Sequence, residues 1–203
     1  MVVISIDGNI GAGKSTVLNY LKNTYKYEVD LEPIDDWIPF LQDMYKNNKD
    51  AFEFQIKVWM DRVFNTEYPT NEITLTERSA FFQWHVFSKA NFENGKLNER
   101  QYMILKNLYD KCEVIPDMYF YIRTDPQKSY DRIHKRSRNC ESEIPLGYIE
   151  TLHHLHENAF EMLQEYNTPN IHVIEMEGKT VQQIGEEIYS KIACVRWRVD
   201  SSK

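Results

Sequence analysis

The chain has little of the residue types that mark extracellular, fibrous or membrane proteins. Its 203 residues include only 3 cysteines, 7 glycines and 7 prolines. Cys112, Cys140 and Cys194 form no C-x-x-C pair, which argues against a zinc site or a disulfide framework and favours reduced thiols. No apolar run approaches the roughly 20 residues that cross a bilayer, so we expect no membrane span.

Basic residues are also in deficit. The chain has 24 lysines and arginines against 31 acidic residues, which gives a net charge of −7. An acidic total argues against nucleic acid as the main partner, because phosphate backbones bind basic surfaces. The ordinary hydrophobic content, 42%, predicts one globular domain over residues 1–203. The first apolar run begins at Val2 and leaves no room for a targeting peptide, which predicts a cytoplasmic protein.

Apolar runs typical of strands alternate with patterns typical of helices along the chain. The predicted strands are Val2–Ile6, Tyr27–Leu31, Ile73–Thr76, Met118–Arg123 and Ile171–Met176. The predicted helices are Ser15–Tyr25, Ile38–Lys46, Ala51–Asn65, Phe81–Asn91, Asn98–Lys111, Pro126–Arg138, Pro145–Tyr166 and Val181–Ala193. This alternation predicts an α/β fold in which helices flank a five-stranded parallel sheet. The residues after Cys194 give no clear signal.

Residues 8–15 match the phosphate-loop pattern G-x-x-x-x-G-K-[ST] at every fixed position, between a strand pattern and a helix pattern. Glycines let backbone N–H groups approach an anion, Lys14 can reach the outer phosphates, and the Ser15 hydroxyl can bind Mg²⁺. The alternative, a turn without a ligand, leaves the fixed positions unexplained. We therefore predict that a nucleoside triphosphate binds to Gly8, Asn9, Ile10, Gly11, Ala12, Gly13, Lys14, Ser15 and Thr16.

Charged residues follow the second and third predicted strands. Glu32 ends the second strand, and Glu77 with Arg78 ends the third. Ligands of open parallel sheets bind at the carboxyl ends of the strands, so we expect these side chains beside the triphosphate. Glu32 can act as a base toward an attacking hydroxyl, Glu77 can hold Mg²⁺, and Arg78 can orient Glu32 or bind a phosphoryl group. The alternatives are a solvated carboxylate for Glu32 and a purely structural ion pair for Arg78.

The densest basic run of the chain lies at residues 132–138. Arg132 and Arg136 are four residues apart and share a face if the run is helical. Arginine offers a forked donor that matches phosphate oxygens, and the run leads into a polar segment. Such a run is often only a solvated helix face. Here Arg132, Arg136 and Arg138 predict a lid, at about residues 132–144, that closes over the phosphates.

The middle of the chain is rich in aromatic residues, most of which we assign to the core: Phe52, Phe54, Trp59, Phe81, Phe82, Trp84 and Phe87. Gln55, Arg62 and Gln83 lie among them, and a buried amide must satisfy its donors and acceptors. A nucleobase edge would satisfy these groups, which predicts a base pocket in this part of the chain.

Together these motifs resemble those of the cellular deoxyribonucleoside kinases, the group with deoxycytidine, deoxyguanosine and mitochondrial thymidine kinases and a multisubstrate insect enzyme. The matching segments are Gly8–Thr16, Glu32-Pro33 with Trp37, Met44-Tyr45-Lys46, Phe54-Gln55, Glu77-Arg78-Ser79, Arg132–Arg138, Pro145-Leu146-Gly147-Tyr148 and Leu152–Glu157. Their joint order and spacing are highly specific. The resemblance implies a phosphate-loop kinase fold with an arginine-rich lid, which transfers the γ-phosphate of ATP to the 5′-hydroxyl of a deoxyribonucleoside with Mg²⁺. It also implies a homodimer.

The resemblance further implies roles for single residues. Glu32 looks like the base that deprotonates the 5′-hydroxyl, with Arg78 as its partner. Tyr45 and Glu141 look like the ligands of the sugar 3′-hydroxyl. The pocket for the base looks to be made by Gln55 as the hydrogen-bonding residue, its neighbour Phe54, Phe87 as the stacking ring and Trp37 as a wall. Arg132, Arg136 and Arg138 look like the lid arginines, and the adenine of ATP is expected near residues 175–178.

Two positions leave the base preference open. Arg62 stands where deoxycytidine and deoxyguanosine kinases place an arginine, which favours purine or cytosine bases. Gln83 stands where those enzymes usually carry an aspartate and thymidine-preferring members a small residue. Because an amide both donates and accepts hydrogen bonds, thymidine stays open as an alternative.

Two other functions are alternatives. A nucleoside monophosphate kinase of the thymidylate kinase type shares the fold, phosphate loop and lid, but Glu32-Pro33 and Phe54-Gln55 suit an uncharged hydroxyl acceptor. A GTP-dependent switch, which is a different class of protein, would carry the motifs N-K-x-D and D-x-x-G. Neither motif is found in the chain.

Overall fold

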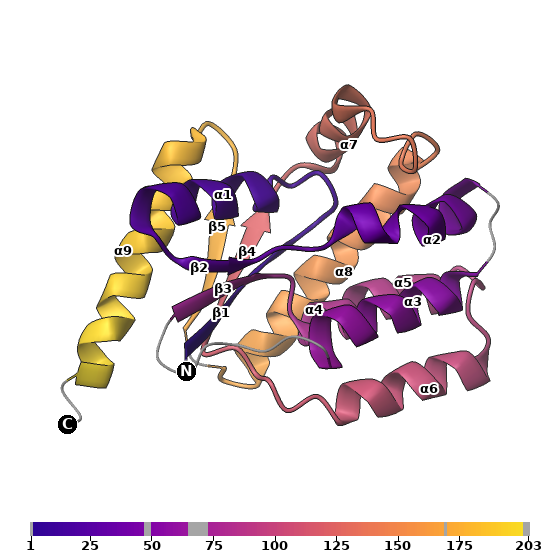
Figure 1. Ribbon diagram of the computed structural model, residues 1–203, viewed down its shortest axis with the longest axis horizontal. Helices are drawn as coiled ribbons and strands as arrows, with labels where there is room; N and C mark the ends of the chain where they lie inside the picture. Colours follow the sequence, from indigo (N-terminus) through magenta and orange to yellow (C-terminus); the bar gives the residue numbers. More distant parts are fainter. Residues whose placement is uncertain (1, 47–49, 65–72, 169, 201–203) are drawn as a thin grey trace.

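The centre of the molecule is a parallel sheet with strand order β2-β3-β1-β4-β5 (Figure 1). The computed structural model describes residues 2–46, 50–64, 73–168 and 170–200. The five strands are β1 (Val2–Gly8), β2 (Glu28–Asp30), β3 (Ile73–Glu77), β4 (Met118–Arg123) and β5 (Ile171–Glu175). The predicted parallel sheet is therefore confirmed, and no predicted strand end is wrong by more than two residues.

Helices connect the strands, as parallel pairing requires. They are α1 (Lys14–Tyr25), α2 (Ile34–Lys46), α3 (Ala51–Trp59), α4 (Ala80–Phe82), α5 (Lys89–Glu93), α6 (Glu99–Asp110), α7 (Pro126–Arg136), α8 (Leu146–Glu165) and α9 (Val181–Asp200), with π-helical segments η1 (Met60–Phe64) and η2 (Gln83–Ser88). The helix predicted from Ile38 begins at Ile34, and α9 continues past Cys194.

Two predicted helices contain π-helical segments. The helix predicted over Phe81–Asn91 consists of α4, η2 and α5. The helix predicted over Ala51–Asn65 changes from α3 to η1 at Met60, and its last residue, Asn65, lies outside the described residues. Hydrophobic periodicity does not distinguish π-helical from α-helical hydrogen bonding within a continuous helix. The extra residue in a π-helical turn shifts the apolar face only over that turn.

The sheet is covered by helices on both faces, and alternation along β4 shows which helices lie on which face. Met118, Phe120 and Ile122 pack with residues of α1 and α9. Tyr119 and Tyr121 point the other way and pack with residues of α4, η2 and α8. The predicted arrangement, a sheet flanked by helices, is thus found.

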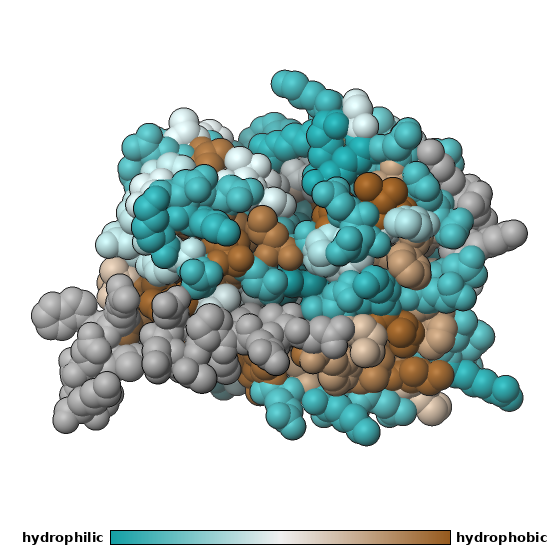
Figure 2. Space-filling model, viewed as in Figure 1, coloured by the Kyte–Doolittle hydropathy of each residue, from teal (hydrophilic) through white to brown (hydrophobic). Residues whose placement is uncertain are grey.

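A third apolar cluster lies beside the sheet, among α2, α3, η2 and α6. Its largest members are Trp37, Phe54, Trp59 and Trp84, all buried. Figure 1 shows these helices grouped to the right of the sheet. Figure 2 shows polar side chains over much of this face and apolar ones gathered over α3 and α6. Met60 of η1 and Met103 of α6 are exposed. Within the described ranges, no helix is both long enough and apolar enough to span a bilayer.

Candidate active site

The phosphate loop joins β1 to α1 and is held by contacts with two other helices. Gly11 and Gly13 have φ of 76° and 96°, the left-handed region that favours glycine. A Cβ atom at Gly11 would overlap the carbonyl oxygen of Ser129 in α7. The Asn9 side chain donates a hydrogen bond from Nδ2 to the Ile149 carbonyl oxygen of α8 at 2.9 Å. The loop is therefore fixed in shape before any ligand binds.

The predicted nucleotide-binding residues divide into two groups. Ile10, Gly11, Gly13, Lys14, Ser15 and Thr16 line a cavity of about 310 Å³. Gly8, Asn9 and Ala12 do not line it, and the side chains of Asn9 and Ala12 are buried. These three residues lie outside the cavity lining, and the buried side chains of Asn9 and Ala12 are placed to support the fold of the loop.

Lys14 lies almost fully buried beneath the loop. Its Nζ donates a hydrogen bond to the Asn9 carbonyl oxygen at 3.1 Å and lies 3.9 Å from Glu77 Oε1. Burial lowers the pKa of Lys14, and the charge of Arg78 lowers it further, while Glu77 and Glu32 oppose both effects. The Lys14 ammonium group thus lies between the phosphate loop and the Glu77 carboxylate. An anion bound in the loop would compete with this carboxylate for the positive charge.

Ser15 and Glu77 bring a hydroxyl and a carboxylate together at the start of α1. Ser15 Oγ donates a hydrogen bond to Glu77 Oε1 at 2.8 Å. Burial raises the pKa of the Glu77 carboxyl, and the nearby Glu32 charge adds to this shift. Oxygen donors of this kind fit Mg²⁺, which usually keeps several waters and phosphate oxygens as its other ligands. Within the described ranges, no group of three or more histidine, cysteine, aspartate or glutamate residues is arranged to hold a metal ion.

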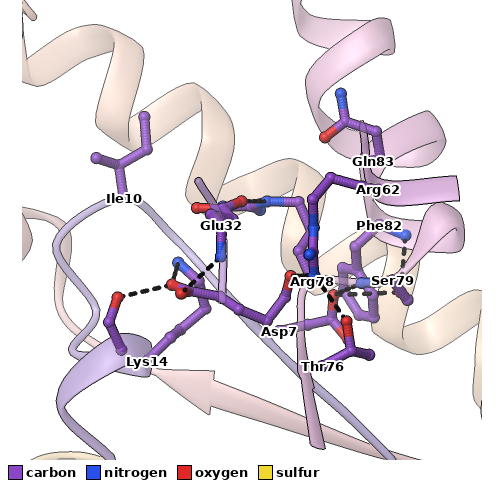
Figure 3. A network of polar contacts seen from close by, with 12 residues as sticks. Asp7, Ile10, Lys14, Glu32, Arg62, Thr76, Arg78, Ser79, Phe82 and Gln83 are labelled. Atoms are coloured by element: carbon purple, nitrogen blue, oxygen red, sulfur yellow. Dashed lines mark hydrogen bonds and ion pairs between the residues drawn. The ribbon is translucent and has the colours of Figure 1, made fainter. Parts of the chain in front are cut away.

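Glu32 and Arg78 form an ion pair at the ends of β2 and β3 (Figure 3). Arg78 Nε donates a hydrogen bond to Glu32 Oε1 at 2.6 Å, and both side chains are largely buried. Burial alone would raise the pKa of Glu32, but the charges of Arg78 and Lys14 outweigh it and hold the pKa below its ordinary value. Glu32 is therefore an ionised carboxylate at neutral pH and can accept a proton.

The backbone at Arg78 adopts an uncommon conformation, with φ of 73°. Its N–H donates to the Ile6 carbonyl oxygen at 3.1 Å, and its guanidinium carbon lies 3.8 Å from the centroid of the Phe87 ring. The turn thus directs the Arg78 side chain to a position between the Glu32 carboxylate and the Phe87 ring. Strained backbone of this kind is commonly found at functional sites.

Asp7 supports this turn, and the sequence reasoning missed it. Its Oδ1 accepts hydrogen bonds from the Ser79 backbone N–H at 2.9 Å and from the Ser79 hydroxyl at 3.2 Å, and its Oδ2 accepts one from Ser5 Oγ at 2.5 Å. Asp7 is fully buried, and burial raises the pKa of its carboxyl. The available signal was a carboxylate at the end of an otherwise apolar strand, which needs a partner.

The cavity extends from the phosphate loop into the space among α2, α3 and η2. All but one of the predicted nucleoside-binding residues line it: Glu32, Trp37, Tyr45, Phe54, Gln55, Arg78, Gln83, Phe87 and Glu141. Trp37 and Phe54 pack edge to face, with ring centroids 5.7 Å apart. Tyr148 also lines the cavity beside Tyr45, with ring centroids 6.2 Å apart, although no role was predicted for it.

Arg62 is the exception, and its predicted place at the base stays a prediction. It does not line the cavity. Its guanidinium donates to Asp30 Oδ1 at 2.5 Å, to Thr76 Oγ1 at 2.8 Å and to the Glu77 carbonyl oxygen at 3.0 Å. The carboxylate of Asp30, one of these acceptors, attracts the Arg62 guanidinium and holds it beside β2 and β3. In this structure Arg62 thus lies outside the cavity, and the preference for purine or cytosine bases stays a prediction.

The segment predicted to form the lid lines part of the cavity. Its helix, α7, ends at Arg136, two residues before the predicted end, and Arg132, Arg136 and Arg138 all line the cavity. Arg136 donates from Nε and Nη2 to the two carboxylate oxygens of Glu141, at 2.8 and 2.7 Å. Arg132 Nη1 lies 3.4 Å from the Ala12 carbonyl oxygen. The structure thus brings the lid and the phosphate loop together.

The segment expected to meet adenine follows β5. The Met176 N–H donates to the Arg123 carbonyl oxygen at 3.0 Å, and Lys128 of α7 forms an ion pair with Glu177. This segment is therefore tied to both β4 and the lid helix. An adenine contact there stays a prediction.

Comparisons with known proteins agree with this geometry. A family model described as deoxynucleoside kinase matches residues 4–195. Human mitochondrial thymidine kinase 2 is 33% identical over 168 aligned positions, and the alignment covers 76% of this chain and 63% of that protein. Mouse deoxycytidine kinase is 30% identical over 207 aligned positions, 80% of each chain. A solved structure of deoxyadenosine kinase from M. mycoides, with dCMP and a flexible dCDP bound, has a TM-score of 0.82 at 25% identity and covers 96% of this chain and 100% of that one.

Proposed function

The chain belongs to the deoxynucleoside kinase family of phosphotransferases, and we propose that it transfers the γ-phosphoryl group of ATP to the 5′-hydroxyl of a deoxyribonucleoside. One observation carries the proposal. The Glu32 carboxylate, held by Arg78 at 2.6 Å, lines the same cavity as the phosphate loop and the aromatic pocket. A base thus lies between a place for phosphates and a place for a nucleoside.

In the proposed reaction, Glu32 accepts the proton of the 5′-hydroxyl as that oxygen attacks the γ-phosphorus atom. The new oxygen–phosphorus bond forms in line with the bond between the γ-phosphorus and the oxygen that bridges it to the β-phosphate. This second bond breaks, and the bridging oxygen leaves as part of ADP. Arg78 keeps Glu32 ionised and oriented. The loop N–H groups, Lys14 and the lid arginines stabilise the charge that develops on the transferred group.

We propose that Ser15 and Glu77 hold Mg²⁺ together with the phosphates of ATP. When bound, the ion would neutralise charge on the β- and γ-phosphate oxygens. The 2.8 Å hydrogen bond between Ser15 and Glu77 supports this, because it shows that the two oxygen donors can reach one point. The remaining nucleotide contacts are assigned to Ile10, Gly11, Gly13, Thr16 and the arginines of the lid.

The nucleoside would lie along the inner part of the cavity. We assign the 3′-hydroxyl to Tyr45 and Glu141, the face of the base to Phe87 and the wall to Trp37 and Phe54. Gln55 and Gln83 are assigned to the edge of the base, and Arg62 is no longer included. The proposal extends to a homodimer, which the resemblance implies, and light scattering after size exclusion would test it. Cytoplasmic location stays a prediction.

Phosphorylation of a nucleoside monophosphate is the second candidate function. An acceptor that carries a phosphate needs an unpaired cation near its own binding site. Among the described residues that line the cavity, the cations other than Arg78 belong to the phosphate loop and the lid, and Arg78 is paired with Glu32. The inner cavity therefore favours an uncharged acceptor.

The test measures ATP-dependent phosphorylation of deoxyadenosine, deoxyguanosine, deoxycytidine and thymidine, with the four monophosphates in parallel. Turnover of nucleosides only would support the proposal. Turnover of a monophosphate only would assign the chain to the second candidate and remove the proposed role of Glu32. GTP in place of ATP serves as a control for the phosphate donor.

A further inference from the structure

The inner end of the cavity holds four polar side chains in an apolar surrounding. Gln55 comes from α3, Gln83 and Ser88 from η2, and Asn91 from α5. All four are buried, with at most 5% of any residue exposed. Gln55, Gln83 and Asn91 line the cavity, and Ser88 lies behind Gln55. Buried amides normally have their hydrogen bonds satisfied, so any group left over needs an explanation.

The carbonyl oxygen of Gln55 has both of its hydrogen bonds filled. Its Oε1 accepts one from Gln83 Nε2 and one from Ser88 Oγ, each at 2.9 Å. A carbonyl oxygen has two lone pairs, so Oε1 can accept no further donor from a ligand. The amide nitrogen of the same side chain, Nε2, is buried and has no hydrogen-bond partner. Gln55 therefore offers a ligand hydrogen-bond donors only.

Asn91 offers the complementary group. Its Nδ2 donates to the Phe87 carbonyl oxygen at 2.9 Å, and because a carbonyl can only accept, this bond fixes the orientation of the amide. The oxygen Oδ1 is left buried without a partner. Gln83, whose Nε2 is engaged by Gln55, keeps its oxygen as a second acceptor at the cavity. The cluster thus combines donors on Gln55 with acceptors on Gln83 and Asn91.

A base edge with the opposite arrangement would satisfy these groups. Cytosine and adenine carry an exocyclic amino group, which donates two hydrogen bonds, next to a ring nitrogen that accepts one. Uracil, thymine and hypoxanthine have a carbonyl in place of the amino group and a protonated ring nitrogen. Such a base has a single N–H at this edge and would leave one of the two acceptors unpaired. An unpaired buried polar group is costly, so the difference selects between substrates.

We propose that Gln83, Ser88 and Asn91 select deoxynucleosides whose base carries, on its Watson–Crick edge, an amino group beside an unprotonated ring nitrogen, namely deoxycytidine and deoxyadenosine. The proposal rests on the kinase function proposed above. Ser88 acts through Gln55 and is a positioning residue, because it occupies the lone pair that a protonated ring nitrogen would need.

The first experiment compares kcat/KM for two matched pairs of substrates, deoxycytidine with deoxyuridine and deoxyadenosine with deoxyinosine. We expect the amino member of at least one pair to be favoured by about tenfold or more, since sites built for hydrogen bonds discriminate strongly. Equal kcat/KM values within both pairs would mean that water satisfies the polar groups of the cluster. A higher kcat/KM for deoxyuridine would mean that the side-chain amides of Gln55 and Gln83 are rotated, with oxygen and nitrogen exchanged. Either result overturns the inference. Failure to phosphorylate any nucleoside would instead overturn the proposed function.

The second experiment uses two variants and a matched control. Ser88→Ala frees one lone pair on Gln55 Oε1, and Asn91→Leu removes the acceptor Oδ1. We expect each to reduce the preference for the amino base about threefold or more, because each loses part of the discrimination of a polar site. Ser190→Ala makes the same change on the exposed face of α9 and should leave the ratio unchanged.

Calorimetric binding of deoxycytidine and deoxyuridine without ATP gives a readout besides turnover, and circular dichroism shows which variants fold. An unchanged ratio in either variant, once folded, contradicts the proposal. If one variant does not fold, the other decides.

Discussion

Arg136 and Glu141 form a two-pronged ion pair that joins the lid helix α7 to the turn after it, with N–O distances of 2.8 and 2.7 Å. The pair links two expected tasks. Arg136 is expected to contact phosphate, and Glu141, which is 5% exposed, is expected to contact the sugar. Bidentate pairs of this kind fix orientation as well as charge. We therefore expect binding at one end of the substrate site to be connected to the other end through this ion pair.

The first prediction concerns that carboxylate. Glu141→Gln should raise the KM for a deoxynucleoside about tenfold, because a charge-assisted hydrogen bond to the 3′-hydroxyl becomes a neutral one. The KM for the matching 2′,3′-dideoxynucleoside should change much less, since that substrate lacks the hydroxyl. Steady-state kinetics with both substrates check this. An equal rise for both would show that Glu141 acts only through Arg136.

The second prediction concerns the proposed base. Glu32→Gln should lower kcat by about 10²- to 10⁴-fold, the usual contribution of a general base. The affinity for ATP, measured by calorimetry, should change little, because the Glu32 carboxylate is hydrogen-bonded to Arg78 and acts on Lys14 of the phosphate loop only through its charge. Glu28→Gln, an exposed position on β2, is the control and should leave kcat unchanged. Substantial activity in Glu32→Gln would contradict the assignment.

The third prediction concerns Asp7. Asp7→Ala leaves the Ser79 N–H and the Ser5 and Ser79 hydroxyls without their acceptor in the core, so the free energy of unfolding should fall by about 1–3 kcal/mol. Asp7→Asn keeps one acceptor oxygen and should cost less. Asp110→Ala, an exposed position on α6, serves as the control. Urea denaturation measures all three, and a loss no larger in Asp7→Ala than in the control would disprove the supporting role.

The fourth prediction concerns pH. Burial lowers the pKa of His85 to about 4, with Lys89 and Lys106 adding to the shift. Burial also places the pKa of His156 well below its ordinary value of 6.5, and Arg78 contributes. Both histidines are neutral in the folded chain but bind protons once unfolded. Their contribution to stability is therefore fully present above pH 6.5 and is lost as the pH falls toward 4.

The measurement is urea denaturation at several pH values between 7.5 and 5. His156→Phe should show a weaker loss of stability over this range than the unchanged chain, because one proton-binding group of the unfolded state is gone. His154→Phe removes an exposed histidine of the same helix and should keep the original pH dependence. The same slope in His156→Phe as in the unchanged chain would contradict the assignment.

The fifth prediction concerns Gly11, where a side chain would meet the Ser129 carbonyl oxygen. Gly11→Ala should weaken ATP binding about tenfold or more, because the loop must move away from the shape that presents its N–H groups. Gly95→Ala is the matched control, since Gly95 has φ of 69° but nothing within 4 Å of a new Cβ atom. It should cost about 1–2 kcal/mol of stability and leave ATP binding unchanged.

The sheet and the phosphate loop were predictable because their signals are local. Strand and helix periodicities alternate along the chain, and the loop pattern fixes four positions between β1 and α1. The place of Glu32 beside Arg78 followed from a rule about strand ends and needed no side-chain detail. These features depend on order along the chain, which a sequence contains directly.

Other features depend on side chains that are far apart in sequence. Arg62 binds Asp30, 32 residues away, and nothing local reveals that this carboxylate takes the guanidinium from the cavity. The contact of Asp7 with Ser79 spans 72 residues. The π-helical segments η1 and η2 were not predicted either, because one extra residue in a turn leaves the amino-acid composition of the segment unchanged. Long-range pairing of polar groups is thus the part that the sequence did not reveal.

Phe87, the ring proposed to stack on the base, has the Arg78 guanidinium over it, 3.8 Å from the ring centroid. The same guanidinium holds Glu32. The proposed base platform and the proposed proton acceptor therefore contact one guanidinium, which sets the separation between them. A substrate must match that separation between its base and its 5′-oxygen. We expect the assembly to reject nucleosides whose sugar is lengthened by one carbon, whatever base they carry.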